Sequence, residues 1–134
     1  MARSIVVLLG HPDARSFCGA LAERYTEAAR DAGHSVHLFR LGELDFDPVL
    51  RQGYRLHQPL EPDLQRIADS IRAADHLVLV YPVWWGGMPA LLKGLIDRIF
   101  LPGFAFRYRE GFALWDKLLG QASAHVIQTL DTPH

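Results

Sequence analysis

Cysteine is almost absent from this chain, because Cys18 is the only cysteine among its 134 residues. A single cysteine excludes an intrachain disulfide and every metal site that is built from several cysteines. It also suits a reducing compartment, so a cytoplasmic location is expected.

An excess of charge of either sign is missing as well. The chain has 14 basic and 15 acidic residues, and its formal net charge is -1. Proteins that bind nucleic acid or an anionic membrane surface usually carry a clear positive excess. We therefore expect neither kind of partner.

Long apolar runs are lacking too, even at the N-terminus. The first run extends only from Ile5 to Leu9 and ends at Gly10. A membrane-spanning helix needs about 20 apolar residues, and the apolar segment of a signal peptide is also longer than this run. No signal peptide and no membrane insertion are expected.

The residues that are present have the balance of a globular protein, with 49% hydrophobic and 22% charged residues. One domain over residues 1–134 is predicted. Apolar runs of strand length alternate with segments of helical period, which indicates a parallel sheet with helices on both faces. We expect strands over 4–10, 34–41, 76–82 and 123–130, helices over 16–33, 62–75 and 89–100, and a long surface excursion over 42–61.

Loops that follow the strands are the expected place for a ligand, because open parallel sheets bind ligands beyond the carboxyl ends of their strands. The first such loop contains neither a dinucleotide-binding glycine pattern nor a P-loop. It does offer a helix N-terminus at Ser16, Phe17 and Cys18, whose free amides can bind a phosphate, with His11 and Arg15 as further donors. Alternatively, Ser16 only caps the helix, Phe17 and Cys18 fill the core, and Arg15 is solvated.

The loop after the third strand has an unusual composition, "YPVWWGGMP". Trp84 and Trp85 can supply rigid aromatic walls, while Gly86 and Gly87 leave backbone amides uncovered. A flat heteroaromatic cofactor needs both features. The alternative is that Trp85 caps the core and the glycines form a turn before the next helix.

The loop after the fourth strand carries Thr129, Asp131 and Thr132 at the same edge. Their hydroxyl and carboxylate groups can contact a ligand, or Asp131 can simply form a turn before Pro133. On the third helix, Lys93, Asp97 and Arg98 are interpreted as a charged outer face. The aromatic residues of segment 104–115 fit a pocket rim, a dimer contact or plain core packing.

Four stretches, "GHPDARSFCGAL", "LDFDPVL", "ADHLVLVYPVWWGGMPALLKGLIDRIFLPGFAF" and "TLDTP", carry a family resemblance over nearly the whole chain. In this order and spacing they resemble the flavodoxin-like NAD(P)H:quinone oxidoreductases, the DT-diaphorase and modulator-of-drug-activity type. The resemblance implies an α/β fold, a flavodoxin-like three-layer sandwich with sheet order 2-1-3-4. It also implies a bound flavin, hydride transfer from NAD(P)H to a quinone or similar acceptor, and a homodimer with both active sites at the subunit interface.

The resemblance also assigns roles to residues. The phosphate and ribityl part of the flavin would be held by His11, Arg15, Ser16, Phe17 and Cys18. The isoalloxazine ring would be lined, largely through backbone donors, by Pro82, Val83, Trp84, Trp85 and Gly86. Its pyrimidine side would face Thr129, Leu130, Asp131 and Thr132. Analogy with the family favours FAD, with FMN as the alternative, and no metal is expected.

One departure from the family stands out, since its members continue beyond the position of His134. We expect a C-terminally shortened version that lacks the fifth strand and leaves the fourth strand as an exposed apolar edge. The tyrosine and histidine that are thought to assist proton transfer have no counterpart, so no catalytic residue is assigned. Alternatives are a flavin-binding ancillary subunit of a potassium efflux system, an inactive fragment, or a one-electron carrier, which the near-neutral charge disfavours.

Overall fold

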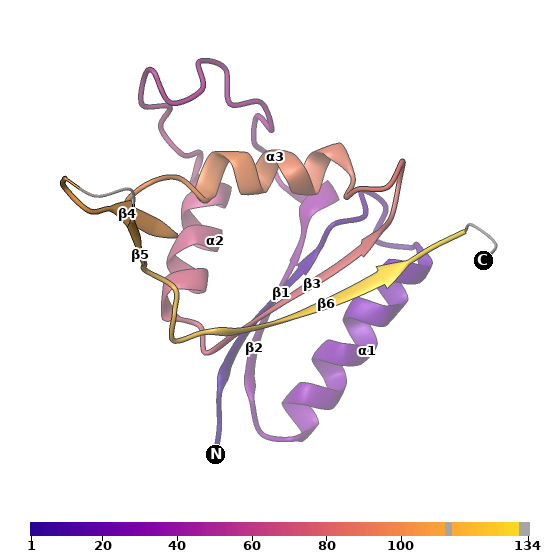
Figure 1. Cartoon of the computed structure of the whole chain (residues 1–134). Coiled ribbons are helices and arrows are strands. Elements are labelled where there is room, and N and C mark those ends of the chain that lie inside the picture. Colours follow the sequence, from indigo (N-terminus) through magenta and orange to yellow (C-terminus); the bar gives the residue numbers. More distant parts are fainter. Residues whose placement is uncertain (112–113, 132–134) are drawn as a thin grey trace.

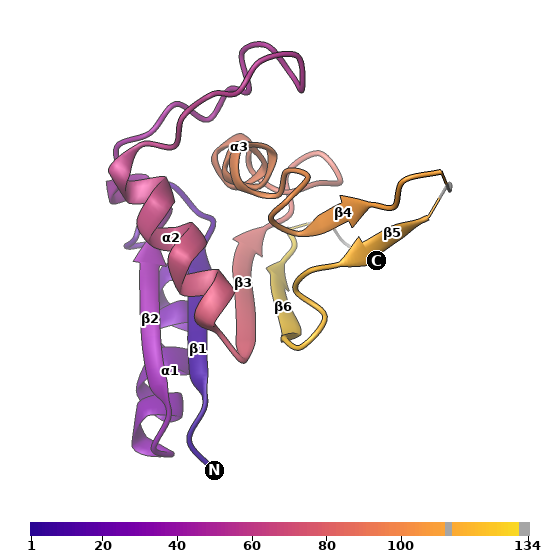
Figure 2. The same cartoon turned by 90° about the vertical axis from the view of Figure 1, so that its left-hand side faces the viewer.

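The computed structural model describes residues 1–111 and 114–131. Four parallel strands form the main sheet: β1 (Ser4–Leu9), β2 (Ser35–Arg40), β3 (His76–Pro82) and β6 (Ser123–Thr129). They lie in the order β2-β1-β3-β6, which can be followed in Figure 2. The predicted order 2-1-3-4 is therefore confirmed.

Three α-helices cover the two faces of this sheet (Figure 1). One face carries α1 (Phe17–Asp31), and the other carries α2 (Pro62–Ala73) and α3 (Ala90–Ile99). Their bounds lie within two residues of the predicted ones, and α2 begins at Pro62 as predicted. Ser16 caps α1 by accepting a hydrogen bond from the Gly19 amide, and Pro62 occupies the first turn of α2.

The core lies on both sides of β1, as its unbroken apolar sequence predicts. Side chains of Ile5, Val7 and Leu9 pack toward α1, whereas Val6 and Leu8 pack toward α2 and α3. All five are at most 4% exposed. Because β1 is packed on both faces, its last residue, Leu9, is held in place, and so is the start of the first loop.

The strand β6 lies at the edge of the sheet, where β3 is its neighbour. Its side chains are largely exposed, and Val126 keeps 48% of its surface open to solvent. The expected exposed apolar edge is confirmed for these residues.

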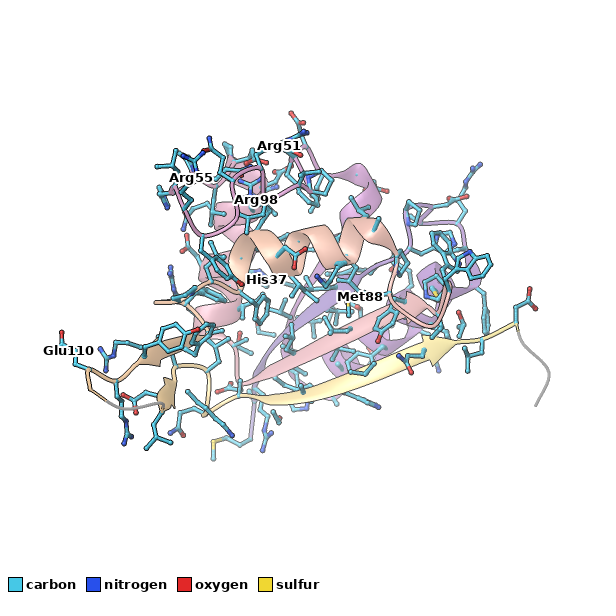
Figure 3. All side chains as sticks on the ribbon, turned by 45° about the horizontal axis from the view of Figure 1, so that its top comes forward. His37, Arg51, Arg55, Met88, Arg98 and Glu110 are labelled. Atoms are coloured by element: carbon cyan, nitrogen blue, oxygen red, sulfur yellow. The ribbon has the colours of Figure 1, made fainter. Side chains whose placement is uncertain are left out.

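The excursion begins after a short 3-10 helix, η1 (Leu41–Glu43), and ends at α2. It is fastened to α3 by Arg98, whose side chain is 0% exposed and donates to the carboxylate of Glu61 and to the carbonyls of Asp47 and Pro59. In Figure 3, Arg98 lies where α3 meets the excursion. The interpretation of Arg98 as part of a charged outer face is wrong, because the excursion folds back over this turn of the helix. Lys93 and Asp97 do form an exposed ion pair.

A small antiparallel hairpin, β4 (Phe106–Tyr108) and β5 (Trp115–Lys117), projects on the side of β6 and α3 and was not predicted (Figure 2). Strands of three residues are too short to produce a periodic pattern. Of the aromatic residues of this segment, Phe104 packs in the core while Tyr108 is 65% exposed. Across the described ranges, none of the helices has both the length and the apolar character needed to cross a membrane.

Candidate functional site

The three predicted loops meet at the carboxyl edge of the sheet (Figure 1). Between them lies a hollow of about 300 Å³. Its lining comes from all three loops and consists of His11, Ser16, Phe17, Cys18, Pro82, Val83, Trp84, Thr129, Leu130 and Asp131. The structure thus brings ten of the predicted site residues together. Arg15, Trp85 and Gly86 lie outside the lining, and Thr132 lies outside the described residues.

Two backbone amides are available at the start of α1. The first N–H groups of a helix have no partner within the helix. Here the Gly19 amide donates to the Ser16 side chain, at 3.1 Å, and the Ala20 amide to the Ser16 carbonyl, at 3.0 Å. Among the described residues, the amides of Phe17 and Cys18 have no acceptor, and both residues line the hollow. The N-terminus of α1 therefore offers the predicted anion-binding donors, and Ser16 acts as a cap as well.

The first loop is held by bonds around Asp13, a residue that the sequence did not single out. The Asp13 amide donates to His11 Nδ1, at 2.9 Å, so the neutral His11 ring carries its proton on Nε2. The Asp13 carboxylate accepts from Arg15 Nε at 3.2 Å, and this bond lowers the pKa of Asp13. The Arg15 side chain is 90% exposed. Arg15 is therefore paired with Asp13 rather than aimed into the hollow.

A tight turn closes the second loop. The Trp84 amide donates to the Gly87 carbonyl and the Gly87 amide to the Trp84 carbonyl. Trp85 has φ 52 and Gly86 has φ 72, and two positive values are the signature of a type I′ turn. Glycine accepts this conformation freely, but tryptophan does so at a cost of about 1 kcal/mol. The strain falls on a residue with a fully exposed side chain, which favours a functional role for Trp85.

Only some of the backbone amides that were predicted to face the isoalloxazine ring are free to do so. Pro82 has no amide hydrogen, the Val83 amide donates to the Thr129 carbonyl at 2.8 Å, and the Trp84 amide is used within the turn. Among the described residues, no acceptor faces the amides of Trp85 and Gly86. These two amides are the donors that remain for a ring.

The indoles point outward, which contradicts the alternative that Trp85 caps the core. Trp84 is 46% exposed and packs edge-on against the His11 ring, with 5.4 Å between the centroids. Phe17 is 70% exposed, so it does not fill the core either. Aromatic surface from two loops therefore borders the hollow. Aromatic walls of this kind suit a flat ligand.

The third loop contributes Thr129, Leu130 and Asp131. Thr129 Oγ1 lies 3.2 Å from the Sγ of Cys18, which is 2% exposed. Leu130 is exposed, and Asp131 adds a carboxylate to the lining. This loop is joined to both of the others through Thr129.

A larger cavity, about 500 Å³, lies at the opposite end of the sheet beside α1. Its lining includes Ile5, Tyr25, His34 and His76. Burial, with the nearby charges of His125 and Arg3, lowers the pKa of His76. Across residues 1–111 and 114–131, no group of three or more His, Cys, Asp or Glu side chains is placed to hold a metal ion. Polar groups in this lining already pair with one another, since His76 Nδ1 lies 2.7 Å from the Ser123 hydroxyl.

The residues at the carboxyl edge fit a flavin phosphate and ring in their chemistry. Free amides at a helix N-terminus, the Ser16 hydroxyl and a neutral histidine N–H match a phosphate. Two free amides beside exposed indoles match the polar rim and the flat face of a heteroaromatic ring. The first set of donors lies in the lining of the hollow, and the second lies at its border next to Trp84, so one elongated ligand can reach both.

Comparison with known proteins agrees with this arrangement. A family with the description "Flavodoxin-like fold" matches residues 3–134. An uncharacterized NAD(P)H oxidoreductase of Haemophilus influenzae is 36% identical over 115 residues, which cover 79% of this chain and 54% of that protein. The NAD(P)H dehydrogenase (quinone) 1 of Cavia porcellus is 30% identical and is matched over 86% of this chain and 48% of its own. The chain thus spans about half the length of these curated relatives.

A solved structure with the same architecture is the NAD(P)H:quinone oxidoreductase from Methanothermobacter marburgensis. It superposes with a TM-score of 0.82 at 28% identity and covers 97% of this chain and 68% of that one. The overall fold and the sequence therefore agree in their assignment of the chain. The chain belongs to the flavodoxin-like family, among relatives that include the NAD(P)H:quinone oxidoreductases.

Proposed function

We propose that residues 1–134 form one flavin-binding domain that transfers hydride from NAD(P)H through the flavin to a quinone or similar acceptor. The observation that carries this proposal is the hollow at the carboxyl edge, which three separate loops line with free amides and aromatic side chains. The relatives named as NAD(P)H oxidoreductases and quinone dehydrogenases support the reaction class.

The start of α1 binds the phosphate in this proposal. The amides of Phe17 and Cys18 donate to it, and the Ser16 hydroxyl can donate while its oxygen still accepts from Gly19. His11 adds the Nε2 proton that its bond from Asp13 leaves free. The positive end of the helix dipole strengthens each of these contacts.

The second loop orients the ring. The amides of Trp85 and Gly86 donate to ring acceptors, where negative charge develops on reduction. The Trp84 indole, held against His11, walls one side and excludes water. A bound flavin supplies the capacity to accept hydride from NAD(P)H and to pass it to an acceptor. Since one open side of the hollow would serve both substrates, we expect ping-pong kinetics.

The flavin is proposed to be FAD, with FMN as the alternative, and the acceptor to be a quinone. The quinone assignment is supported by the names of the Cavia porcellus and Methanothermobacter marburgensis relatives. The choice of FAD is supported by the family resemblance alone. A cytoplasmic location completes the proposal, supported by the single cysteine.

A homodimer is also proposed. Exposed apolar side chains project from the excursion and from the hairpin, among them Tyr54, Leu56, Tyr108 and Leu114. Apolar groups on projecting segments are typical of surfaces that a partner covers. Size-exclusion chromatography with light scattering tests this; a monomer at all concentrations would exclude the dimer.

An absorbance spectrum of the purified protein tests the cofactor. We expect a yellow protein whose colour is released by heat, and chromatography then separates FAD from FMN. Stopped-flow mixing with NADH should bleach the flavin band, and a soluble benzoquinone should restore it. A colourless protein that takes up neither flavin at micromolar concentration would overturn the proposed function.

A further inference from the structure

Thr129, the last residue of β6, lies where the three loops of the hollow meet. Its carbonyl accepts the Val83 amide at 2.8 Å, which ties it to the second loop. Its Oγ1 lies 3.2 Å from Cys18 Sγ, which ties it to the start of α1. Three pieces of chain that are far apart in sequence are thus joined through one threonine.

The contact with Cys18 links parts of the site that backbone pairing does not join. β6 pairs with β3, whereas α1 lies over one face of the sheet and has no backbone bonds to β6. Cys18 is 2% exposed, so its thiol has little access to water as an alternative partner. Removal of the Thr129 hydroxyl would leave this buried thiol without its partner, which costs more than the loss of a similar contact at the surface.

The first turn of α1 is also confined from behind. A Cβ added at Gly19 would lie 1.9 Å from the carbonyl oxygen of Ala14, so the loop presses directly against the helix at that point. The first loop packs against one side of this helical turn at Gly19, and Thr129 contacts the other side through Cys18. The position of the Phe17 and Cys18 amides relative to the third loop therefore depends on this side-chain bridge.

We propose that the Cys18–Thr129 side-chain bridge is a positioning pair that sets the distance between the phosphate-binding amides and the ring-binding loops, and thereby the affinity for flavin. This inference rests on the proposed function and deepens it. Neither side chain is assigned a chemical step. Their bridge acts by pre-organisation, because loops already held in the bound arrangement lose less freedom when the ligand binds.

The test measures the flavin dissociation constant by fluorescence quenching, with FMN and with FAD, and separately the melting temperature of the flavin-free protein. Thr129→Val keeps the shape of the side chain and removes the hydroxyl. We expect it to weaken flavin binding roughly three- to tenfold, the size of one hydrogen bond. Thr129→Ser and Cys18→Ser keep a hydroxyl in the bridge and should stay within about twofold. Cys18→Ala combined with Thr129→Val should bind no more weakly than the weaker single variant, because both remove the same contact.

Thr26→Val is the matched control. Thr26 is buried, lies on α1 like Cys18 and undergoes the same chemical change as Thr129, but its Oγ1 has no partner among the described residues. This variant should leave flavin affinity unchanged.

The outcomes separate the two proposals. If the native protein binds flavin and Thr129→Val binds it equally well, the bridge has no positioning role while the proposed function stands. If Thr129→Ser loses as much affinity as Thr129→Val, the hydroxyl is irrelevant and the inference is overturned. If the native protein binds neither flavin, the proposed function fails first and this inference falls with it.

Discussion

Replacement of Arg98 by methionine is the sharpest test of how the fold is held together. The Arg98 side chain is 0% exposed, and its two terminal nitrogens bond to the Glu61 carboxylate, at 2.6 and 3.2 Å, and to two backbone carbonyls. These bonds fasten the excursion to α3. Methionine fills similar volume but donates no hydrogen bond, so the Glu61 carboxylate and the two carbonyls lose the hydrogen bonds from Arg98.

The expected loss of unfolding free energy follows from this geometry. Breaking a buried ion pair by removal of one partner costs about 3–5 kcal/mol. Glu61 keeps 29% side-chain exposure and still accepts the Asp47 amide at 2.7 Å, so water can solvate part of the orphaned carboxylate. We therefore expect Arg98→Met to lose about 3 kcal/mol of unfolding free energy, the lower end of that range. For a domain whose total stability is about 5–15 kcal/mol, this is a large fraction.

Urea denaturation followed by circular dichroism measures the effect. Lys93→Ala on the same helix is the control, because the Lys93–Asp97 pair is exposed and should contribute less than about 0.5 kcal/mol. Adding Glu61→Gln to Arg98→Met should recover about 1 kcal/mol, since the double variant no longer contains an unpaired charge. A loss for Arg98→Met as small as that for Lys93→Ala would show that the buried ion pair does not hold the excursion in place.

The same pair predicts an acid limit to stability. Its hydrogen bond from Arg98 lowers the pKa of Glu61 in the folded protein below its usual 4.5. The contribution is therefore complete above pH 4.5 and is lost as the pH falls through the folded value. In Arg98→Met this part of the pH dependence should disappear from the urea midpoints.

Three further outcomes are expected. Trp85→Gly should raise the melting temperature, because it relieves a positive φ that costs about 1 kcal/mol. It should also weaken flavin binding by about tenfold or more, because the indole is lost. A lower melting temperature would contradict the proposed strain at Trp85. Thr26→Val should be neutral or stabilising by about 1 kcal/mol in urea unfolding, since it removes a buried hydroxyl that has no partner in the described structure, and a clear loss would indicate a hidden partner. Burial and the charges of His125 and Arg3 lower the pKa of His76, so its contribution to stability is complete above pH 6.5 and declines as the pH falls below that value. In His76→Asn the urea midpoint should therefore change less between about pH 5 and pH 7 than in the native protein. An equal change in both proteins would exclude His76 as the cause.

Much of the site was predictable because it depends on local patterns that recur at one edge of a parallel sheet. Ser16 and Trp85 follow a strand and Thr129 ends one, and the carboxyl ends of parallel strands meet at the same edge. The sequence could not indicate that Asp13 pairs with Arg15, because an exposed arginine can as readily face a ligand as a neighbour. Nor could it indicate which amides of the second loop stay free, because that depends on the turn type.

The layered arrangement of sheet and helices can be predicted from the hydrophobic pattern alone. The β-branched run of β1 requires burial on both faces, and the apolar stripes of the helices require a sheet to cover, so the layers follow from periodicity. The strand order 2-1-3-4 was implied by the family resemblance instead. The burial of Arg98 against Glu61 and the contact between Cys18 and Thr129 become visible only in the folded protein. Both depend on segments that meet across long stretches of chain, and the spacing of residues along one segment carries no information about a partner supplied by another.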